Sequence, residues 1–332
     1  MKSIRLLFSS LLLLVLCNVC IAQQYDFEVD NLYYKVLSLE DNTVKVVSNG
    51  EYSHDYRGNG NITIPEFVLF RGRSFRVTEI DNGAFMRGRG LHTVYMPNSI
   101  VSMGQYAFFE CQDLYTFSLS ENLSVIPHHA FSPSCRILDL SIPSNVVAIG
   151  EEARIGTREY LTFEMSDVPL EVFYGAFSRN NSIFLSRNLV NKENRPTFIY
   201  FCDKMTIDDN VTSILSFDED SYSGNGRYIY GPTLSDITFG ASLKQIPSFK
   251  QAKTLESITV RATTPPSAEG FPEIVYMDAT LYVPIGTKSL YEKAEIWGNF
   301  LKIEETEIYN YIRKVEAEEM SAAELFGLMG DD

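Results

Sequence analysis

The chain has 332 residues, 45% of them hydrophobic, and includes 22 Phe and 19 Tyr. Disordered segments are poor in such residues, so this composition excludes disorder over most of the length. The formal net charge of −15 argues against partners that need a basic surface, namely nucleic acids and anionic membranes. We therefore expect a folded, acidic protein with a substantial core.

Residues 1–22 have the layout of a secretory signal peptide. Lys2 and Arg5 precede an apolar stretch from Leu6 to Leu16, and Cys20 and Ala22 place small side chains at the −3 and −1 positions before Gln23. We expect cleavage after Ala22 and export of the chain, which raises the net negative charge to −17 because Lys2 and Arg5 are lost with no acidic residue.

An alternative for this segment is a lipoprotein signal acylated at Cys17 or Cys20. The residues just before each of these cysteines fit such a signal poorly, so lipid anchoring is the less favoured prediction. No later segment is long and apolar enough to predict a membrane span.

Residues 23–76 are expected to form an N-terminal β cap that includes the first strand of a repeat region. Two apolar runs, Tyr33–Leu39 and Thr43–Val47, flank the turn signal Glu40-Asp41-Asn42 and predict a hairpin. The motif Ile62-x-Ile64-Pro65 matches Val94-x-Met96-Pro97, so the first repeat strand is predicted there.

Residues 77–277 show an internal period of 23 residues. Alanine recurs at this spacing at five positions: Ala84, Ala107, Ala130, Ala153 and Ala176. Phe follows four of these five alanines, and an apolar residue stands four positions before each of them. Such self-similarity is the signature of a solenoid, in which stacked turns share one core.

A second pattern, apolar-x-x-apolar-x-apolar, predicts one half-buried strand per turn. It occurs at Leu91/Val94/Met96, Leu114/Phe117/Leu119, Ile137/Leu140/Ile142, Tyr160/Phe163/Met165, Cys202/Met205/Ile207, Leu234/Ile237/Phe239 and Leu255/Ile258/Val260. The predicted fold class is a leucine-rich-repeat solenoid, mainly of β strands with short helices or turns and capped at both ends.

Several turns depart from the pattern. Arg154 stands where Phe is expected, with Ile155 as the residue that could fill the core instead. The fifth turn is expected to lose its strand, because Ser186 and Asn188 fall at the inward positions. Insertions are expected near 186–199 and 217–230, so the clean face is predicted in the first four turns.

Residues 278–305 are expected to form the C-terminal cap. Leu281-x-Val283-Pro284 predicts a last strand, and a helix is predicted from Lys288 to Trp297, with Leu290, Tyr291, Ala294 and Trp297 on one side. Residues 306–332 form an acidic tail, in which Ser321-x-x-Glu324 is a capping box before a short helix. This helix is expected to be marginally stable and mobile, with docking on the body or on a partner as the alternative.

The repeat sequences and the C-terminal closing unit resemble the BspA-like leucine-rich repeats of bacterial surface proteins. The resemblance is strongest in the repeats over 77–123 and in the closing unit over 254–266 and 279–300, and it extends from about Tyr25 to Glu305. It implies a capped solenoid at the cell surface with a role in adhesion or protein binding, and it implies no particular ligand.

Catalytic and metal-binding patterns are not found. The cysteines of the mature chain, Cys111, Cys135 and Cys202, are odd in number and are expected to be buried thiols, with a Cys111–Cys135 bridge as the alternative. The four histidines lack zinc-ligand spacing, the Asp218–Asp220 segment lacks the later ligands of a calcium loop, and Gly224–Gly226 lacks a phosphate-loop context. A carboxylate pair for glycoside hydrolysis is not excluded by number alone, but no enzymatic activity and no cofactor are expected.

The strand pattern also predicts which residues face outward. The candidate partner-binding residues are His92, Thr93, Tyr95, Tyr115, Thr116, Ser118, Asp139, Ser141, Thr162 and Glu164. The favoured hypothesis is an exported surface module that binds an extracellular protein through this face. Two alternatives are a glycan-binding accessory protein and a structural surface component without a discrete ligand.

Overall fold

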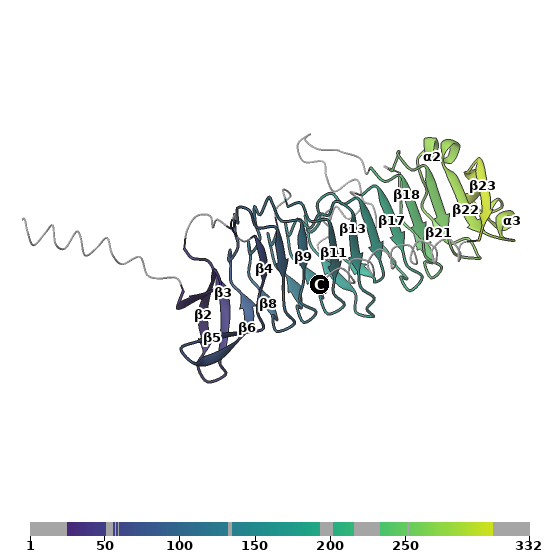
Figure 1. Ribbon diagram of the computed structural model, residues 1–332. Helices are drawn as coiled ribbons and strands as arrows, with labels where there is room; N and C mark the ends of the chain where they lie inside the picture. The colour runs from purple at the N-terminus through teal and green to yellow at the C-terminus, as the bar shows by residue number, and fades with distance from the viewer. Residues whose placement is uncertain are drawn as a thin grey trace, which may run out of the picture.

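The computed structural model describes residues 25–50, 56, 58, 60–131, 135–192, 202–215, 233–250 and 252–307. These form an elongated stack of chain turns, with a strand-rich cap at the N-terminal end and short helices at the other end (Figure 1). The predicted signal peptide, the insertion at 217–230, the tail beyond Glu307 and the Asp218–Asp220 and Gly224–Gly226 segments lie outside the described residues.

One strand per turn lies on the front of the stack, each parallel to the next. Two runs of strands pair in this way, and the second is an 8-stranded sheet. The strands are β4 (Asn61–Thr63), β7 (Thr93–Tyr95), β9 (Thr116–Ser118), then β11 (Asp139–Ile142), β13 (Tyr160–Phe163), β15 (Ser182–Leu185), β17 (Lys204–Ile207), β18 (Asp236–Phe239), β20 (Ser257–Val260), β22 (Thr280–Pro284) and β23 (Lys302–Thr306).

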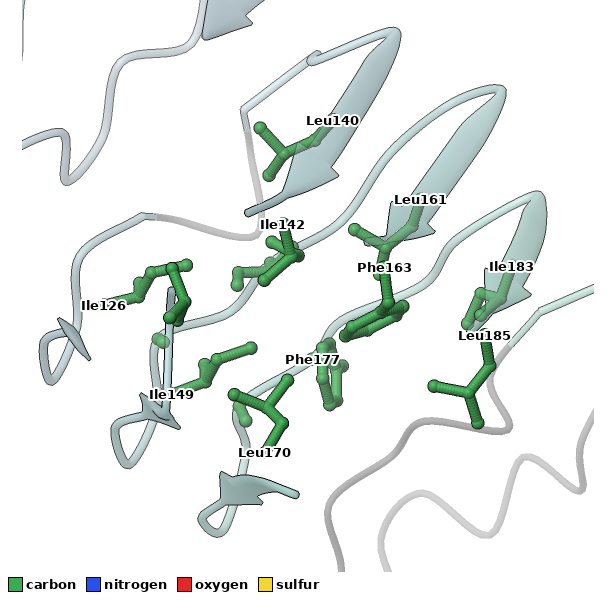
Figure 2. Close-up of a cluster of buried hydrophobic side chains, with 14 of the residues drawn as sticks. Ile126, Leu140, Ile142, Ile149, Leu161, Phe163, Leu170, Phe177, Ile183 and Leu185 are labelled. Atoms are coloured by element: carbon green, nitrogen blue, oxygen red, sulfur yellow. The ribbon is translucent and has the colours of Figure 1, made fainter. Parts of the chain in front are cut away.

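Shorter strands line the back of the stack. They are β8 (Ser102–Met103), β10 (Val125–Ile126), β12 (Ala148–Ile149), β14 (Leu170–Val172), β16 (Leu189–Val190), β19 (Gln245–Ile246) and β21 (Ser267–Ala268). Inward side chains from both sides meet between the two layers, where Leu140, Leu161 and Ile183 face Ile126, Ile149 and Leu170 (Figure 2). The stacked turns therefore share one apolar interior, as the period predicts.

The five alanines form one column at the bend of each turn. The backbone N–H groups of Phe85, Phe108 and Phe131 donate to the carbonyls of Ala107, Ala130 and Ala153, at 2.9, 2.9 and 3.1 Å. Four of the five alanines are fully buried, and Ala84 is 6% exposed. Only a small side chain fits there, because the Phe rings behind it stack between turns, Phe85 on Phe108 at 5.0 Å.

The fourth turn follows a different register from the one predicted. Leu161 and Phe163 point inward, and Met165 is 68% exposed instead of buried. Tyr160, predicted inward, is 45% exposed. The reason is a shorter repeat: Asp139 and Tyr160 are register partners only 21 residues apart.

Arg154 marks the place where this turn changes. It has a left-handed backbone (φ 57°) where Phe131 stood one turn earlier, and its side chain is paired with Glu152. The next residue, Ile155, is 1% exposed and bridges to Phe177, as Phe108 bridges to Phe131. The prediction that Ile155 fills the core is confirmed.

The fifth turn keeps its strand, contrary to the prediction. Ile183 and Leu185 of β15 point into the core, whereas Ser186 and Asn188 follow the strand. The same two-residue shift explains the error, because Ser186 and Asn188 are inward only if a strict 23-residue period is imposed. The front face therefore continues from β11 to β23 through the described residues rather than ending after four turns.

The N-terminal end is closed by a curled sheet with strand order β1-β2-β3-β6-β5. Its strands are β1 (Phe27–Val29), β2 (Leu32–Ser38), β3 (Thr43–Val47), β5 (Phe67–Phe70) and β6 (Arg73–Ile80). The strands β2 and β3 pair antiparallel where the hairpin is predicted. The end of β6 pairs with β8, so this sheet continues into the back of the first turn.

The C-terminal end is closed by helices α2 (Glu273–Asp278), α3 (Lys288–Tyr291) and η2 (Trp297–Asn299). The predicted helix from Lys288 to Trp297 is wrong in extent: α3 ends at Tyr291, and Leu290 is 49% exposed. Trp297 is buried as predicted, and its indole N–H donates to the Pro266 carbonyl at 2.7 Å. That hydrogen bond fixes the ring from a short 3-10 turn, so a continuous helix is unnecessary.

Candidate binding face

The front sheet displays alternate residues of neighbouring strands in rows. Tyr95 of β7 is paired with Ser118 of β9, and Ser141 of β11 with Thr162 of β13. The strand β11 lies beside β9 in the stack, where the Leu138 N–H just before β11 donates to the Tyr115 carbonyl just before β9 at 2.9 Å. Since the residues between them, such as Val94 and Phe117, are buried, the rows form a surface held from behind by the core.

Two predicted aromatic residues are prominent on this surface. Tyr95 is 46% exposed and Tyr115 is 41% exposed. The imidazole of His92 lies beside the Tyr115 ring, with centroids 5.5 Å apart and planes tilted by 31°. The strand ladder limits the motion of both tyrosine backbones, so these rings are presented at low cost in conformational entropy.

The other predicted residues differ in exposure. His92, Thr116, Ser118 and Thr162 are half-buried, and Asp139, Ser141 and Glu164 are exposed. Thr93 is 7% exposed, so its assignment to the accessible face is wrong. The strand β7 is flanked on both sides, and the Thr93 N–H donates to Gly60 of the cap at 3.1 Å, so the cap junction lies against this residue.

Two predicted carboxylates hold the backbone instead of standing free. Asp139 accepts a hydrogen bond from the Tyr160 N–H at 3.1 Å. Glu164 accepts from the Ser144 N–H at 3.0 Å and from the Ser141 hydroxyl at 3.4 Å. Glu164 follows β13 rather than lying within it, a consequence of the shortened turn. Both side chains therefore brace the loops of adjacent turns.

Two exposed residues of the same surface were not predicted. Leu138 is 38% exposed and Tyr160 is 45% exposed. Tyr160 follows Asp139 in register, and Leu138 immediately precedes Asp139. The sequence signal was available in Tyr160-Leu161-Thr162-Phe163, whose own alternation places Leu161 and Phe163 inward, but the fixed 23-residue spacing masked it. We call Tyr95, Tyr115, Leu138 and Tyr160 the tyrosine patch.

Burial favours the neutral form of two thiols, Cys111 and Cys202. Burial raises the pKa of the Cys202 thiol to about 12 and also raises the pKa of Cys111 far above the usual range. The Cys111 thiol donates to the Phe85 carbonyl at 3.0 Å, and no disulfide joins Cys111, Cys135 or Cys202, so the alternative Cys111–Cys135 bridge is absent.

One histidine away from the patch, His129, has a packing role. The His129 ring stacks on Tyr106, with centroids 4.8 Å apart and planes inclined by 8°. Over the ranges given above, no group of three or more His, Cys, Asp or Glu side chains is arranged to hold a metal ion. What the front sheet offers is a firm surface with exposed aromatic area.

Parallel strands repeated turn by turn around one apolar interior define a leucine-rich-repeat solenoid. Residues 61–159 match the family model of the BspA type leucine rich repeat region, in 6 copies. Residues 61–159 therefore carry repeats of the BspA type.

Solved structures of bacterial repeat proteins are also similar. A leucine-rich repeat protein from Bacteroides capillosus is 26% identical, covering 36% of this chain and 83% of its own, with a TM-score of 0.30. A leucine rich cell surface protein from Faecalibacterium prausnitzii is 14% identical, covering 84% and 94%, with a TM-score of 0.35. The pneumococcal vaccine antigen PcpA is 14% identical, covering 85% and 98%, with a TM-score of 0.37.

These superpositions are too loose to support a conclusion about ligand or partner. No curated protein matches the chain. Among the helices that the structure describes, none has the length and apolarity that crossing a membrane requires.

Proposed function

We propose that the mature chain is an exported surface module and that its tyrosine patch binds an extracellular protein. The observation that carries the proposal is that Tyr95, Tyr115, Leu138 and Tyr160, each at least 38% exposed, lie in or just before the front strands of four consecutive turns. Tyrosine combines a large apolar ring with a hydroxyl that can donate a hydrogen bond, which suits it to anchor a partner.

A protein partner fits the patch better than other ligands do. Leu138 adds exposed aliphatic area on the turn between those of Tyr115 and Tyr160, and apolar area of this kind is buried in the centre of protein interfaces. The acidic charge of the chain favours a partner with basic groups around its contact surface. The front sheet is a shallow surface suited to a broad contact.

Export is supported by the composition of residues 1–22 and by the BspA-type repeats. N-terminal sequencing of the chain recovered outside the cell is expected to begin at Gln23. If mass spectrometry instead finds a chain that begins at Cys17 or Cys20 and carries a lipid there, the lipoprotein alternative holds and cleavage after Ala22 is wrong.

The binding proposal is tested by capture of partners from host and bacterial surface extracts with the mature chain, followed by titration of the partner identified. We expect the double variant Tyr95→Ala/Tyr115→Ala to bind at least about tenfold more weakly, because two central anchors are truncated. The matched control is Ile285→Ala/Leu301→Ala, whose residues are 61% and 74% exposed at the far end of the molecule.

Thermal unfolding of both double variants checks that each remains folded. Unchanged affinity of the tyrosine double variant would reject the patch as the binding site. Retention on a glycan array that depends on the same tyrosines, with no protein captured, would replace the protein partner by a glycan.

A further inference from the structure

Two of the three cysteines lie on neighbouring turns in equivalent surroundings. The Cys111 thiol donates to the Phe85 carbonyl at 3.0 Å, and the Cys135 thiol donates to the Phe108 carbonyl at 3.7 Å. The Phe85 and Phe108 rings stack at 5.0 Å, so the two carbonyls occupy the same place in consecutive turns of the stack. The two sulfur atoms therefore lie side by side, separated by about the 4.8 Å spacing of adjacent strands.

The backbone also brings the two cysteines together. Arg136, the residue after Cys135, donates its N–H to the Leu114 carbonyl at 2.9 Å, and the Leu114 N–H donates to the Cys111 carbonyl at 3.3 Å. The spacing of turns paired in this way falls within the Cα separations of about 4.4–6.8 Å that a disulfide spans. A bridge therefore requires rotation of two side chains rather than movement of the turns.

The third cysteine has no such neighbour. Cys202 precedes β17, whereas Cys135 precedes β11, and three strand steps separate these two strands in the sheet order. Three steps correspond to about 14 Å, which is too far for a disulfide. Cys202 is also fully buried. It is therefore an internal control for any chemistry that depends on the two adjacent thiols.

The two adjacent thiols differ in their access to solvent. Cys135 is half-buried, whereas Cys111 is fully buried. Burial raises the pKa of Cys111, and the nearby Cys135 raises it further, so Cys111 stays protonated until its neighbour has reacted. Since a thiolate attacks a disulfide, Cys135 is the residue that meets a soluble oxidant first.

A chain outside the cell meets an oxidising environment, in which neighbouring thiols form and keep disulfides. We propose that Cys111 and Cys135 are a redox pair, and that their disulfide joins the turn of β9 to the turn of β11 in the exported chain. The structure describes the reduced half of this pair. The inference rests on the export proposed above.

The reaction is a thiol–disulfide exchange with a small-molecule disulfide such as oxidised glutathione. The Cys135 thiolate attacks one sulfur of that disulfide, whose S–S bond breaks and releases one small thiolate with the electron pair. The Cys111 sulfur then attacks the Cys135 sulfur of the mixed disulfide, and the second small thiolate leaves and takes up the Cys111 proton. Two cysteine thiols and one small disulfide thus become one protein disulfide and two small thiols.

The bridge would lie directly behind the tyrosine patch. Tyr115 is four residues after Cys111 and Leu138 is three residues after Cys135, and the Leu138 N–H donates to the Tyr115 carbonyl. The disulfide would hold these two patch residues in register. It would also stabilise the fold, because it restricts the unfolded chain across the segment between the two cysteines.

The first test maps disulfides in the purified mature chain after incubation in glutathione buffers that range from reducing to oxidising. The chain is denatured, alkylated and cleaved after glutamate without reduction. Cleavage after Glu121, the only glutamate between the two cysteines, leaves their peptides joined only by a disulfide. We expect joined peptides of Cys111 and Cys135 in the oxidising buffers, with Cys202 alkylated in every buffer.

The second test compares urea midpoints, followed by circular dichroism, in the reducing and the oxidising buffer. We expect a higher midpoint for the oxidised chain, and the same midpoint in both buffers for Cys135→Ser, which replaces a half-buried residue. The matched control is Cys202→Ala, which removes the third thiol and should keep both the joined peptides and the difference between buffers.

Three outcomes would overturn the proposal. Both thiols could remain reduced in every buffer, or Cys135 could carry glutathione without joining Cys111. The joined peptides could also come from two chains, which non-reducing electrophoresis would reveal as a dimer. All three are measured on the purified chain without a partner, so they leave the tests of export and of the tyrosine patch unaffected.

Discussion

At the scale of single residues, the close stacking of turns leaves positions where no side chain fits. Gly150 begins the bend of the fourth turn, and a Cβ built there would lie 2.7 Å from the His128 nitrogen and 2.9 Å from the Pro127 carbonyl carbon. Both atoms belong to the backbone of the same bend, one strand-spacing away, and backbone cannot rotate aside as a side chain can. Glycine is needed there for space rather than for an unusual φ.

We expect Gly150→Ala to lower the free energy of unfolding by about 1–3 kcal/mol, because overpacking displaces backbone. The control is Gly58→Ala, where an added Cβ meets nothing within 4 Å. Its effect should stay within about 0.5 kcal/mol. Urea titration followed by circular dichroism measures both. Equal stability of the two variants would contradict the close approach at Gly150.

At the scale of elements, one buried side chain joins three consecutive turns. Arg187 follows β15 and is 1% exposed. Its Nη1 donates to the carbonyls of Pro143 and Ser144 at 3.4 and 3.1 Å, and Nη2 donates to Val168 at 2.6 Å. These carbonyls belong to the loops after β11 and β13. Burial lowers the pKa of this guanidinium, and its Nε has no partner.

The balance at Arg187 is between a costly buried charge and three carbonyls that depend on it. We expect Arg187→Met to lower the free energy of unfolding by about 2–3 kcal/mol, because the loss of three hydrogen bonds from a charged donor outweighs the desolvation relieved. Arg179→Met is the control, since that exposed ion pair with Asp203 should contribute under about 1 kcal/mol. A stabilised Arg187→Met chain would show that desolvation dominates.

At the scale of the whole molecule, each turn contacts only its neighbours, so the two ends are coupled weakly. The C-terminal end contains the only tryptophan, with the Trp297 ring 5.6 Å from Phe271 and 6.3 Å from Phe300. The N-terminal half contains Cys111, a fully buried thiol. Trp297 fluorescence and Cys111 labelling therefore report on opposite ends.

We expect Phe300→Ala to lower the urea midpoint of Trp297 fluorescence, with a loss of about 3–5 kcal/mol at that end. The midpoint for thiol labelling of Cys111, identified by mass spectrometry of its peptide, should change little. The converse control, Leu114→Ala beside Cys111, should shift the labelling midpoint and spare the fluorescence. A common shift of both probes in either variant would establish a single cooperative unit.

The sequence was most informative where residue type and spacing act locally. Recurrent alanines predict the bends because only a small side chain fits between stacked turns, and the apolar alternation around Val94 and Phe117 predicts strands with one buried side. The buried Ile155 was also foreseeable, as the nearest apolar residue to the misplaced Arg154. These features need no knowledge of distant contacts.

The errors share one cause. A strict 23-residue period assigned Met165 and Ser186 to inward positions. The fourth turn is two residues shorter than this period, and no residue type in that turn signals the shortening. Thr93 was misplaced because its exposure depends on the cap beside it. Tyr160 joined the patch only because the true register between β11 and β13 places it beside Asp139, the residue that follows Leu138.

By itself, the sequence determined the architecture, since a repeated pattern of small and apolar residues has few ways to bury its apolar side other than by stacking turns. The tertiary structure alone decided which side chains remain accessible, in the tyrosine patch above all. Exposure depends on the register between strands and on which element lies alongside, and both are properties of contacts between residues far apart in the chain.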